Sequence, residues 1–387
     1  MKDGCYFDYC ATTPVDDFVQ QEMAPFFQDF YGNPSSLHAY GNKARQALEL
    51  ARSRVAEGLH CSPENLVFTS GATEANNLAL LGVMNAFPPQ KNHLITTAIE
   101  HHSVLHAAEA LEKRGYQVSY LSVDAQGLVS PDALASAILP STGLISVMMV
   151  NNEVGTIQDI HALGKIAQQA DVFFHTDAVQ AAPFLEVDLE RLPVDLLSLS
   201  AHKMYGPKGV GALYIGKGVP LSPLLHGGAQ EDKLRPGTEN VPGIVGLGAA
   251  MALRSEQRVT RAAHYRRLRQ TLIEEIRSRF PEAVIHGPEE QAAPHIISVG
   301  FPDVDAEMLL FHLNRHKVAV SMGSACTSES MEPSHVLSAL GVPGPFIQST
   351  IRISIGSPTR EEEVDILLEV LPEALKLSRS HPESTDE

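Results

Sequence analysis

Short apolar runs alternate with stretches of helical periodicity from Asn65 onward. Seven of these runs have the length of strands: 65–70, 93–98, 117–123, 143–150, 172–177, 194–200 and 209–216. Helix-period segments separate the earlier runs, an order that is typical of strand–helix–strand crossovers. The pattern predicts a large α/β domain built on a mostly parallel, seven-stranded sheet.

The order of elements changes after Val241. A long helical pattern covers 243–257 and 262–280, and strand-like segments follow at 295–301, 318–324 and 349–356. Further helical segments lie at 306–316, 334–341 and 361–377. This order predicts a smaller α+β domain. We expect a large domain over 15–258 and a small domain formed by 1–14 and 259–387.

Charge and composition exclude several classes of partner. The formal net charge is −17, from 46 acidic and 29 basic residues, and no run of Lys and Arg stands out. An electrostatic grip on nucleic acid or anionic membranes is therefore not expected. The chain shows neither a signal-peptide core nor an apolar run long enough to span a bilayer. We expect a cytoplasmic protein that binds small molecules or other proteins.

Polar residues cluster where the central strands end, and the most informative are Asn152, Asp177, Gln180, Ser200, His202 and Lys203. Because ligands of open parallel sheets bind beyond the carboxyl ends of the strands, we expect these side chains to share one crevice. A single such residue would be read as a turn or cap. Their recurrence on successive strands favours a common site.

The segment "FTSGATEANN" joins a strand end to the start of a helix. Backbone N–H groups at Ala72 and Thr73 would form a cup for a phosphate group, with the Thr73 hydroxyl beside them. An ordinary helix cap by Ser70 or Thr73 is the alternative reading of this motif.

The segment "EHHSV" offers histidines at another strand end. His101 could stack on a flat ligand, whereas a loop histidine with one hydrogen bond is the plain alternative. His102 and His106 have the spacing of a metal-binding pair, but no further acidic or thiol ligand lies nearby, so we expect no metal site.

These ingredients together match pyridoxal phosphate. That cofactor needs a lysine for its Schiff base and an acidic partner for its ring nitrogen, and Lys203 and Asp177 are the candidates. Gln180 and Asn152 could bind the ring oxygen. The phosphate would be held by Thr73, Ser200 and His202.

The whole chain resembles cysteine desulfurases of the NifS/IscS type, in the class V aminotransferase family. The motifs that carry the resemblance are "FDYCATTP", "GNPSSLH", "FTSGATEANN", "EHHSV", "VNNEVGTIQDI", "HTDAVQ", "SAHKMYGPKG", "RPGTENV", "GSACTSESMEPSHVL" and "STIRISIG". The resemblance implies the fold of fold-type I pyridoxal phosphate enzymes. It also implies a catalytic Lys203 and a ring-stacking, catalytic His101.

The resemblance assigns further residues to the cofactor and the substrate. It implies that Thr238 binds the phosphate in the partner subunit, which would make the enzyme a homodimer. Asn33 and Arg352 are implied to hold the carboxylate of the substrate, L-cysteine.

Cys326 lies in "SMGSACTSES", whose small and polar residues are typical of a mobile loop. A small buried core residue is the alternative reading of a free cysteine. The resemblance implies that the Cys326 thiolate takes the sulfur of cysteine as a persulfide and leaves L-alanine. An acceptor protein would then receive the sulfur for Fe–S cluster assembly or another pathway such as tRNA thiolation.

No resident metal is expected, although Cys326 is a candidate Fe–S ligand during transfer. The other cysteines, Cys5, Cys10 and Cys61, form no CxxC pair and are interpreted as structural free thiols.

Two alternative functions remain open on sequence grounds. Another class V enzyme, such as an aminotransferase or selenocysteine lyase, would share Lys203 and Asp177 but need not use Cys326. A scaffold or sulfur-trafficking adaptor would keep the fold without the chemistry. Formation of alanine and sulfide from cysteine, and uptake of the cofactor, separate these functions.

Overall fold

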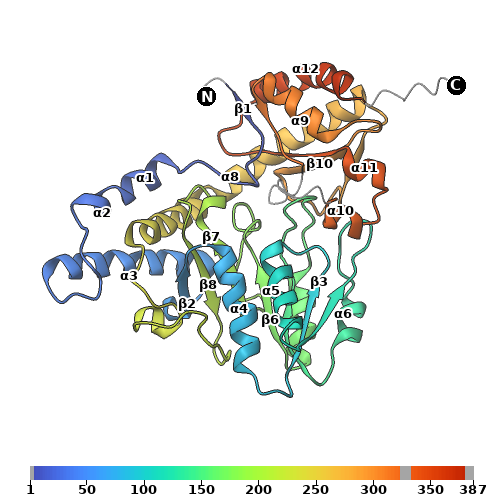
Figure 1. The fold of residues 1–387 in the computed structure, drawn as a ribbon. Coiled ribbons are helices and arrows are strands. Elements are labelled where there is room, and N and C mark those ends of the chain that lie inside the picture. The colour runs from blue at the N-terminus through green and yellow to red at the C-terminus, as the bar shows by residue number, and fades with distance from the viewer. Residues whose placement is uncertain (1–3, 323–332, 380–387) are drawn as a thin grey trace.

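A seven-stranded sheet lies at the centre of the computed structural model, which describes residues 4–322 and 333–379 (Figure 1). Its strands are β2 (Leu66–Thr69), β3 (His93–Thr97), β4 (Gln117–Leu121), β5 (Thr142–Ser146), β6 (Phe173–Asp177), β7 (Leu196–Ser200) and β8 (Gly211–Ile215). The order across the sheet is β2-β8-β7-β6-β5-β3-β4. Only β8 is antiparallel to its neighbours β2 and β7. The predicted fold class is confirmed.

Alternate residues of these strands point to opposite faces of the sheet, because successive side chains of a strand do so. Val67, Leu94, Leu144 and Leu196 pack with α4 (Ala72–Ala86) and α5 (His102–Glu112). Their neighbours Phe68, Ile95, Ile145 and Leu197 pack with α3 (Ala39–Leu59), α7 (Ile160–Gln169) and α8 (Val241–Arg279). Helices therefore cover both faces, which explains the nearly continuous apolar runs in the sequence.

A second, smaller sheet has the order β12-β10-β9 and is antiparallel throughout. Its strands are β9 (Val284–His286), β10 (Ile296–Gly300) and β12 (Thr350–Ser354). It shares a separate core with α9 (Ala306–Arg315), α12 (Glu361–Ser378) and the second half of α8. The predicted domain boundary at 258 falls within α8, and the division into two domains stays a prediction.

The N-terminal segment joins the second core. β1 (Cys5–Tyr6) pairs in parallel with β11 (Val318–Ala319), and Phe7 is fully buried among the residues of that core. Two short helices, α10 (His335–Ala339) and α11 (Gly344–Gln348), lead into β12. Residues 5–7 are therefore built into the C-terminal part of the chain.

The structure contains further helices for which the sequence pattern gave no bounds. The part of the chain that contains the large sheet has four such helices: α1 (Asp17–Met23), α2 (Pro25–Gln28), α3 and α6 (Pro131–Ala137). It also contains three short 3-10 turns: η1 (Pro63–Asn65), η2 (Ala201–Lys203) and η3 (Gln230–Lys233). The predicted strand 143–150 is longer than β5, which ends at Ser146. The sequence is apolar beyond the strand because Val147 to Val150 are also buried. None of the helices within the described residues is long and apolar enough to cross a membrane.

Candidate active site

β6 and β7 are neighbouring parallel strands that end at the same edge of the sheet. Asp177 closes β6 opposite Ser198 of β7. β7 continues through Ser200 into η2, whose last residue is Lys203. Because the two strands end side by side, a buried carboxylate and a lysine lie at one edge of the sheet, as expected for strand ends.

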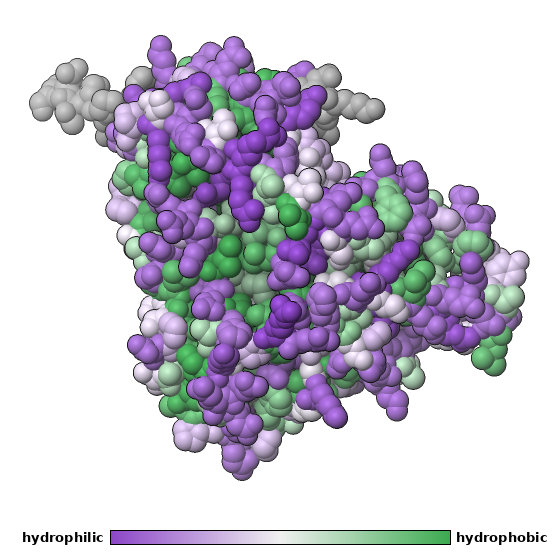
Figure 2. Space-filling view, turned by 180° about the vertical axis from the view of Figure 1, so that it is seen from behind, coloured by the Kyte–Doolittle hydropathy of each residue, from purple (hydrophilic) through white to green (hydrophobic). Residues whose placement is uncertain are grey.

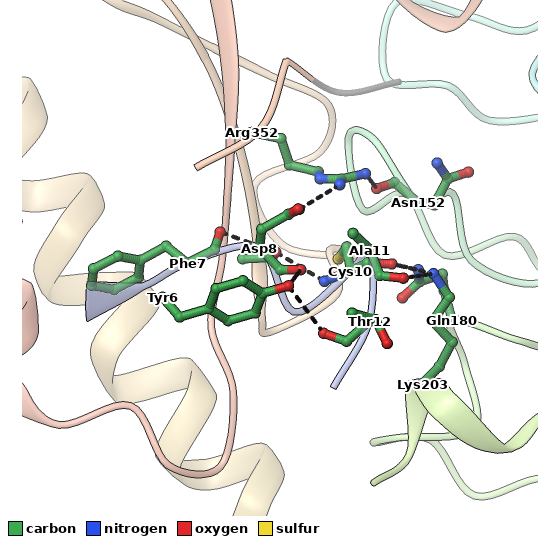
Figure 3. A network of polar contacts seen from close by, with 11 residues as sticks. Tyr6, Phe7, Asp8, Cys10, Ala11, Thr12, Asn152, Gln180, Lys203 and Arg352 are labelled. Carbon is green, nitrogen blue, oxygen red and sulfur yellow. Dashed lines mark hydrogen bonds and ion pairs between the residues drawn. The ribbon is translucent and has the colours of Figure 1, made fainter. Parts of the chain in front are cut away.

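The amine of Lys203 contacts the N-terminal segment of the chain. It donates a hydrogen bond to the carbonyl oxygen of Ala11 at 2.8 Å and another to that of Cys10 (Figure 3). The amide nitrogen of Gln180 donates to the same Cys10 oxygen at 3.0 Å. Residues 10 and 11 therefore position the Lys203 amine beside Gln180.

Arg352 lies in β12 and is 2% exposed. One terminal nitrogen donates to Oδ1 of Asp8 and the other to the carbonyl oxygen of Asn152, each at 2.9 Å. Burial alone would lower the pKa of Arg352, but Cys10, Asp8 and Glu153 together raise it above its ordinary value. The guanidinium stays charged and can receive an anionic group.

The segment between Asp8 and Thr13 lies between Arg352 and Lys203 (Figure 3). The Cys10 amide donates to Oγ of Ser354 in β12 at 3.0 Å, while the Thr13 amide donates to the carbonyl oxygen of His202 at 3.0 Å. This segment thus bridges the small sheet and η2. Sequence reasoning missed Asp8, because a short irregular segment carries no periodic signal.

The Asp177 carboxylate belongs to a buried hydrogen-bond network. Its oxygens accept from the Asn76 side-chain amide at 2.7 Å and the Val179 backbone at 3.0 Å. The Asn76 nitrogen also lies 2.9 Å from Oγ of Ser103. Ser103 in turn lies against Nδ1 of His101, at 2.8 Å from its hydroxyl and 3.1 Å from its amide. Asn76 and Ser103 were not predicted, since each lies in the first turns of an ordinary helix.

The phosphate cup predicted at the start of α4 stays a prediction. No side chain of the described residues caps this helix, whose N-cap Gly71 has φ = 153°. The first backbone N–H groups of α4 belong to Ala72 and Thr73, directly after Gly71. A Cβ atom added at Gly71 would lie 4.0 Å from Oγ of Ser200. Open N–H groups and the positive end of the helix dipole favour an anion here.

His202 completes this edge of the site. Its Nδ1 lies 3.1 Å from the hydroxyl of Thr12. Burial and the charges of Lys203 and Lys208 lower the pKa of His202 to about 4. A neutral His202 can donate a hydrogen bond to a phosphate oxygen.

These groups fit pyridoxal phosphate. Lys203 supplies the amine, Asp177 supplies a carboxylate that is 6% exposed, and the start of α4 supplies the phosphate cup. Asn152, Gln180, Ser200 and His202 surround the same edge of the sheet, at or after the ends of their strands.

Two predicted residues lie away from this centre in the single chain. Asn33 and Thr238 are both exposed, and Oδ1 of Asn33 accepts from the Ser35 backbone at 2.9 Å. Their chain neighbours, including Ser35 and Glu239, line one open hollow of about 460 Å³. Asn33 lies in the segment that joins α2 to α3. This segment belongs to the part of the molecule that projects beside α2 in Figure 1 and from the opposite side in Figure 2. Within residues 4–322 and 333–379, neither Asn33 nor Thr238 forms a hydrogen bond with Lys203.

Cys326 lies outside the described residues. Among the described residues that follow Cys326, Oγ of Ser334 donates to the Glu153 carboxylate at 2.6 Å. Nε2 of His335 contacts the Glu100 carbonyl oxygen at 2.9 Å. These contacts hold the start of α10 against the strand-end edge of the large sheet.

The three described cysteines are free thiols whose pKa values are raised. Burial raises the pKa of Cys5 and Cys10 above the ordinary value, and raises that of Cys61 to about 12. Each is therefore a weak nucleophile at neutral pH. His102 and His106 have ring centroids 5.1 Å apart, but within 4–322 and 333–379 no group of three or more His, Cys, Asp or Glu residues could hold a metal ion.

Comparisons with known proteins show the family of this chain. Residues 5–367 match the family described as aminotransferase class-V. A cysteine desulfurase IscS of Dictyoglomus turgidum is 45% identical over 380 residues, which cover 98% of this chain and 96% of the relative. A solved NifS-like protein has a TM-score of 0.91 and 41% identity, covering 96% of this chain and 99% of that one.

A further solved structure is SspA in complex with cysteine. It has a TM-score of 0.80 and 40% identity, and the match covers 91% of this chain and 98% of SspA. These matches cover nearly the whole chain. The chain therefore belongs to the aminotransferase class-V family, among cysteine desulfurases of the NifS/IscS type.

Proposed function

We propose that this protein is a pyridoxal-phosphate-dependent cysteine desulfurase that converts L-cysteine to L-alanine and keeps the sulfur as a persulfide on Cys326. The observation that carries the proposal is that Lys203 and Arg352 contact one short segment of the chain, at Ala11 and at Asp8. A lysine and a charged arginine so placed suit an amino acid whose amine reacts and whose carboxylate is held. The name of the cysteine-bound relative supports the same substrate.

The cofactor would be held by residues of this chain and its partner. Ala72, Thr73, Ser200, His202 and the partner subunit's Thr238 would bind the phosphate group, and Asp177 the ring nitrogen. Asn152 and Gln180 would bind the ring oxygen, while His101 would stack on the ring. When bound, pyridoxal phosphate supplies an electron sink for negative charge at the substrate Cα.

The chain's own groups then divide the reaction among them. Arg352 and Asn33 hold the substrate carboxylate, and Lys203 moves the proton at Cα. The Cys326 thiolate attacks the sulfur of cysteine, so that an S–S bond forms as the C–S bond breaks. The carbon skeleton receives a proton and leaves as L-alanine, and the thiol of Cys326 has become a persulfide.

The proposal also covers the partners of the protein and its location in the cell. We propose a homodimer, a cytoplasmic location, and transfer of the persulfide sulfur to an acceptor protein. The acceptor would be an Fe–S scaffold or a sulfur carrier of another pathway, such as tRNA thiolation. The division into a large domain, 15–258, and a small domain, 1–14 with 259–387, belongs to the same proposal.

The decisive experiment compares wild type with Cys326→Ala and Lys203→Ala. Cys326→Ala should still bind the cofactor and L-cysteine, but lose alanine formation by several orders of magnitude, because the covalent nucleophile is gone. Lys203→Ala should lose covalent attachment of the cofactor, measured by mass spectrometry after borohydride reduction.

Matched controls are Cys61→Ala, whose thiol has a raised pKa, and Lys217→Ala, whose side chain is exposed just after β8. Both should retain activity. Mass spectrometry should find the added sulfur on Cys326. Full alanine formation by Cys326→Ala would refute the proposed sulfur transfer.

A further inference from the structure

We propose that Asn76 and Ser103 are positioning residues, which hold the His101 ring as a neutral imidazole with its proton on Nε2 and orient the Asp177 carboxylate. This inference deepens the proposed function, because it rests on the roles proposed there for His101 and Asp177. The four side chains form a chain of contacts from Asp177 through Asn76 and Ser103 to His101.

The orientation of the Asn76 amide is determined by its neighbour. A carboxylate can only accept hydrogen bonds, so the amide nitrogen must face Oδ2 of Asp177, which lies 2.7 Å away. The reversed amide would bring two oxygen atoms together at that distance. Asn76 is fully buried, and its Oδ1 has no partner among the described residues. The hydrogen bond to Asp177 therefore fixes the orientation of the Asn76 amide, although its oxygen is left without a donor among the described residues.

This orientation decides the direction of the next hydrogen bond. The second hydrogen of the Asn76 amide points to Oγ of Ser103, at 2.9 Å. Ser103 Oγ therefore accepts from Asn76, and its own hydrogen is directed to Nδ1 of His101, at 2.8 Å. Ser103 is 8% exposed, so water competes little for this hydroxyl.

Nδ1 of His101 then faces two donors, the hydroxyl and the backbone N–H of Ser103. A ring nitrogen that accepts a hydrogen bond carries no proton, so a neutral His101 has its proton on Nε2. Protonation of Nδ1 would sacrifice both contacts. The ring plane is fixed for the same reason, and proton exchange by His101 is restricted to Nε2.

The charges around His101 act in the same direction overall. Burial lowers its pKa, the charge of Lys203 from η2 and the imidazoles of His335 from α10 and His106 from α5 lower it further, and Asp177 from β6 opposes them. The net shift is downward, which favours the neutral ring that the hydrogen bonds select.

The test observes the imidazole directly. Full-length protein with ¹⁵N-labelled histidine is titrated by NMR between pH 5 and 9, both as purified and after removal of the cofactor, and His101 is assigned by its loss in His101→Gln. Wild type should show a neutral His101 with its proton on Nε2. Ser103→Ala and Asn76→Leu should each raise the pH at which His101 titrates, because the donor to Nδ1 is removed or released.

A kinetic readout complements the spectra. Asn76→Leu should lower kcat about 10- to 100-fold, the loss expected for hydrogen bonds to a charged group, with little change in KM. Ser103→Thr keeps the hydroxyl and should restore the His101 spectrum. Ser53→Ala, which removes an exposed hydroxyl bonded to Glu49 within α3, is the matched control and should change neither readout.

A wild-type His101 with its proton on Nδ1, or an unchanged titration in both Ser103→Ala and Asn76→Leu, would overturn the inference. Failure of the proposed function is a separate result: wild type would then form no alanine from L-cysteine, whereas the NMR titration of His101 would still report on Asn76 and Ser103.

Discussion

Arg352 combines full burial with a retained charge, which makes it the most demanding single position of the site. Arg352→Lys keeps the charge but cannot reproduce the planar fork that contacts Asp8 and Asn152. We expect KM for L-cysteine to rise about 10- to 100-fold, since one charge-assisted hydrogen bond is worth about 1.5–3 kcal/mol. Steady-state kinetics measure this change.

Arg267→Lys is the control, because Arg267 is 61% exposed and pairs with Glu361 at the surface. It should leave KM unchanged. A normal KM in Arg352→Lys would mean that another group binds the substrate carboxylate.

Glu100 makes stability depend on pH. Its fully buried carboxyl group accepts from the Met148 backbone at 2.8 Å and the Thr97 hydroxyl at 2.9 Å. Burial raises the pKa of Glu100 from 4.5 to about 8, so the folded protein keeps a proton that the unfolded chain has lost. The contribution of Glu100 to the free energy of unfolding should therefore fall as pH rises from about 4.5 to about 8, and change no further above that pH.

Glu100→Gln cannot ionise and should remove this contribution. Relative to the variant, wild type should lose up to about 1.4 kcal/mol per pH unit between pH 5 and 8, measured by urea unfolding. Glu57→Gln, at an exposed position of α3, is the control. Parallel stability curves for wild type and Glu100→Gln would contradict the assignment.

At the scale of elements, Arg254 joins α8 to two neighbouring segments. It is 3% exposed and donates to the carbonyl oxygens of Gly58 at 3.1 Å, of Ala182 and of Leu185. Arg254→Met would leave these oxygens without their donor. We expect the free energy of unfolding to fall by about 3 kcal/mol or more, because each unmet buried group costs about 1–3 kcal/mol.

Arg258→Met tests whether this loss is specific to Arg254. Arg258 lies one turn later in α8 and pairs at 3.4 Å with Glu186, whose side chain is 63% exposed. Such a pair contributes at most about 1 kcal/mol. Chemical unfolding of both variants should separate them clearly, and equal stabilities would argue against the role of Arg254.

At the scale of the whole molecule, the projecting part around α2 and the start of α3 carries unusual apolar exposure. Phe27 is 63% exposed, Tyr31 68%, Leu37 88% and Tyr40 56%. Such surfaces are typical of contacts between chains. If the proposed homodimer uses this surface, Tyr31→Asp with Leu37→Asp should give a monomer in sedimentation and strongly reduced activity, because the partner's Thr238 is lost.

Phe311→Asp is the control for an exposed aromatic residue elsewhere, since Phe311 is 54% exposed in α9. It should remain dimeric and active. A dimer that survives the double substitution with full activity would place the interface on another surface.

The sequence by itself determined the large sheet and predicted many residues of the candidate site. Strands β2 to β8 lie within one or two residues of the predicted runs where these runs are short, because burial on both faces leaves a local apolar signature. Asp177 and Lys203 were predicted for a related reason: both stand at strand ends, whose positions are also encoded locally.

Only the tertiary structure decided how distant segments meet. Arg352 contacts Asp8 across 344 positions, and Asn76 contacts Asp177 across 101. Neither pair has a periodic signal, because side-chain periodicity reports which face of an element is buried and not which partner covers it.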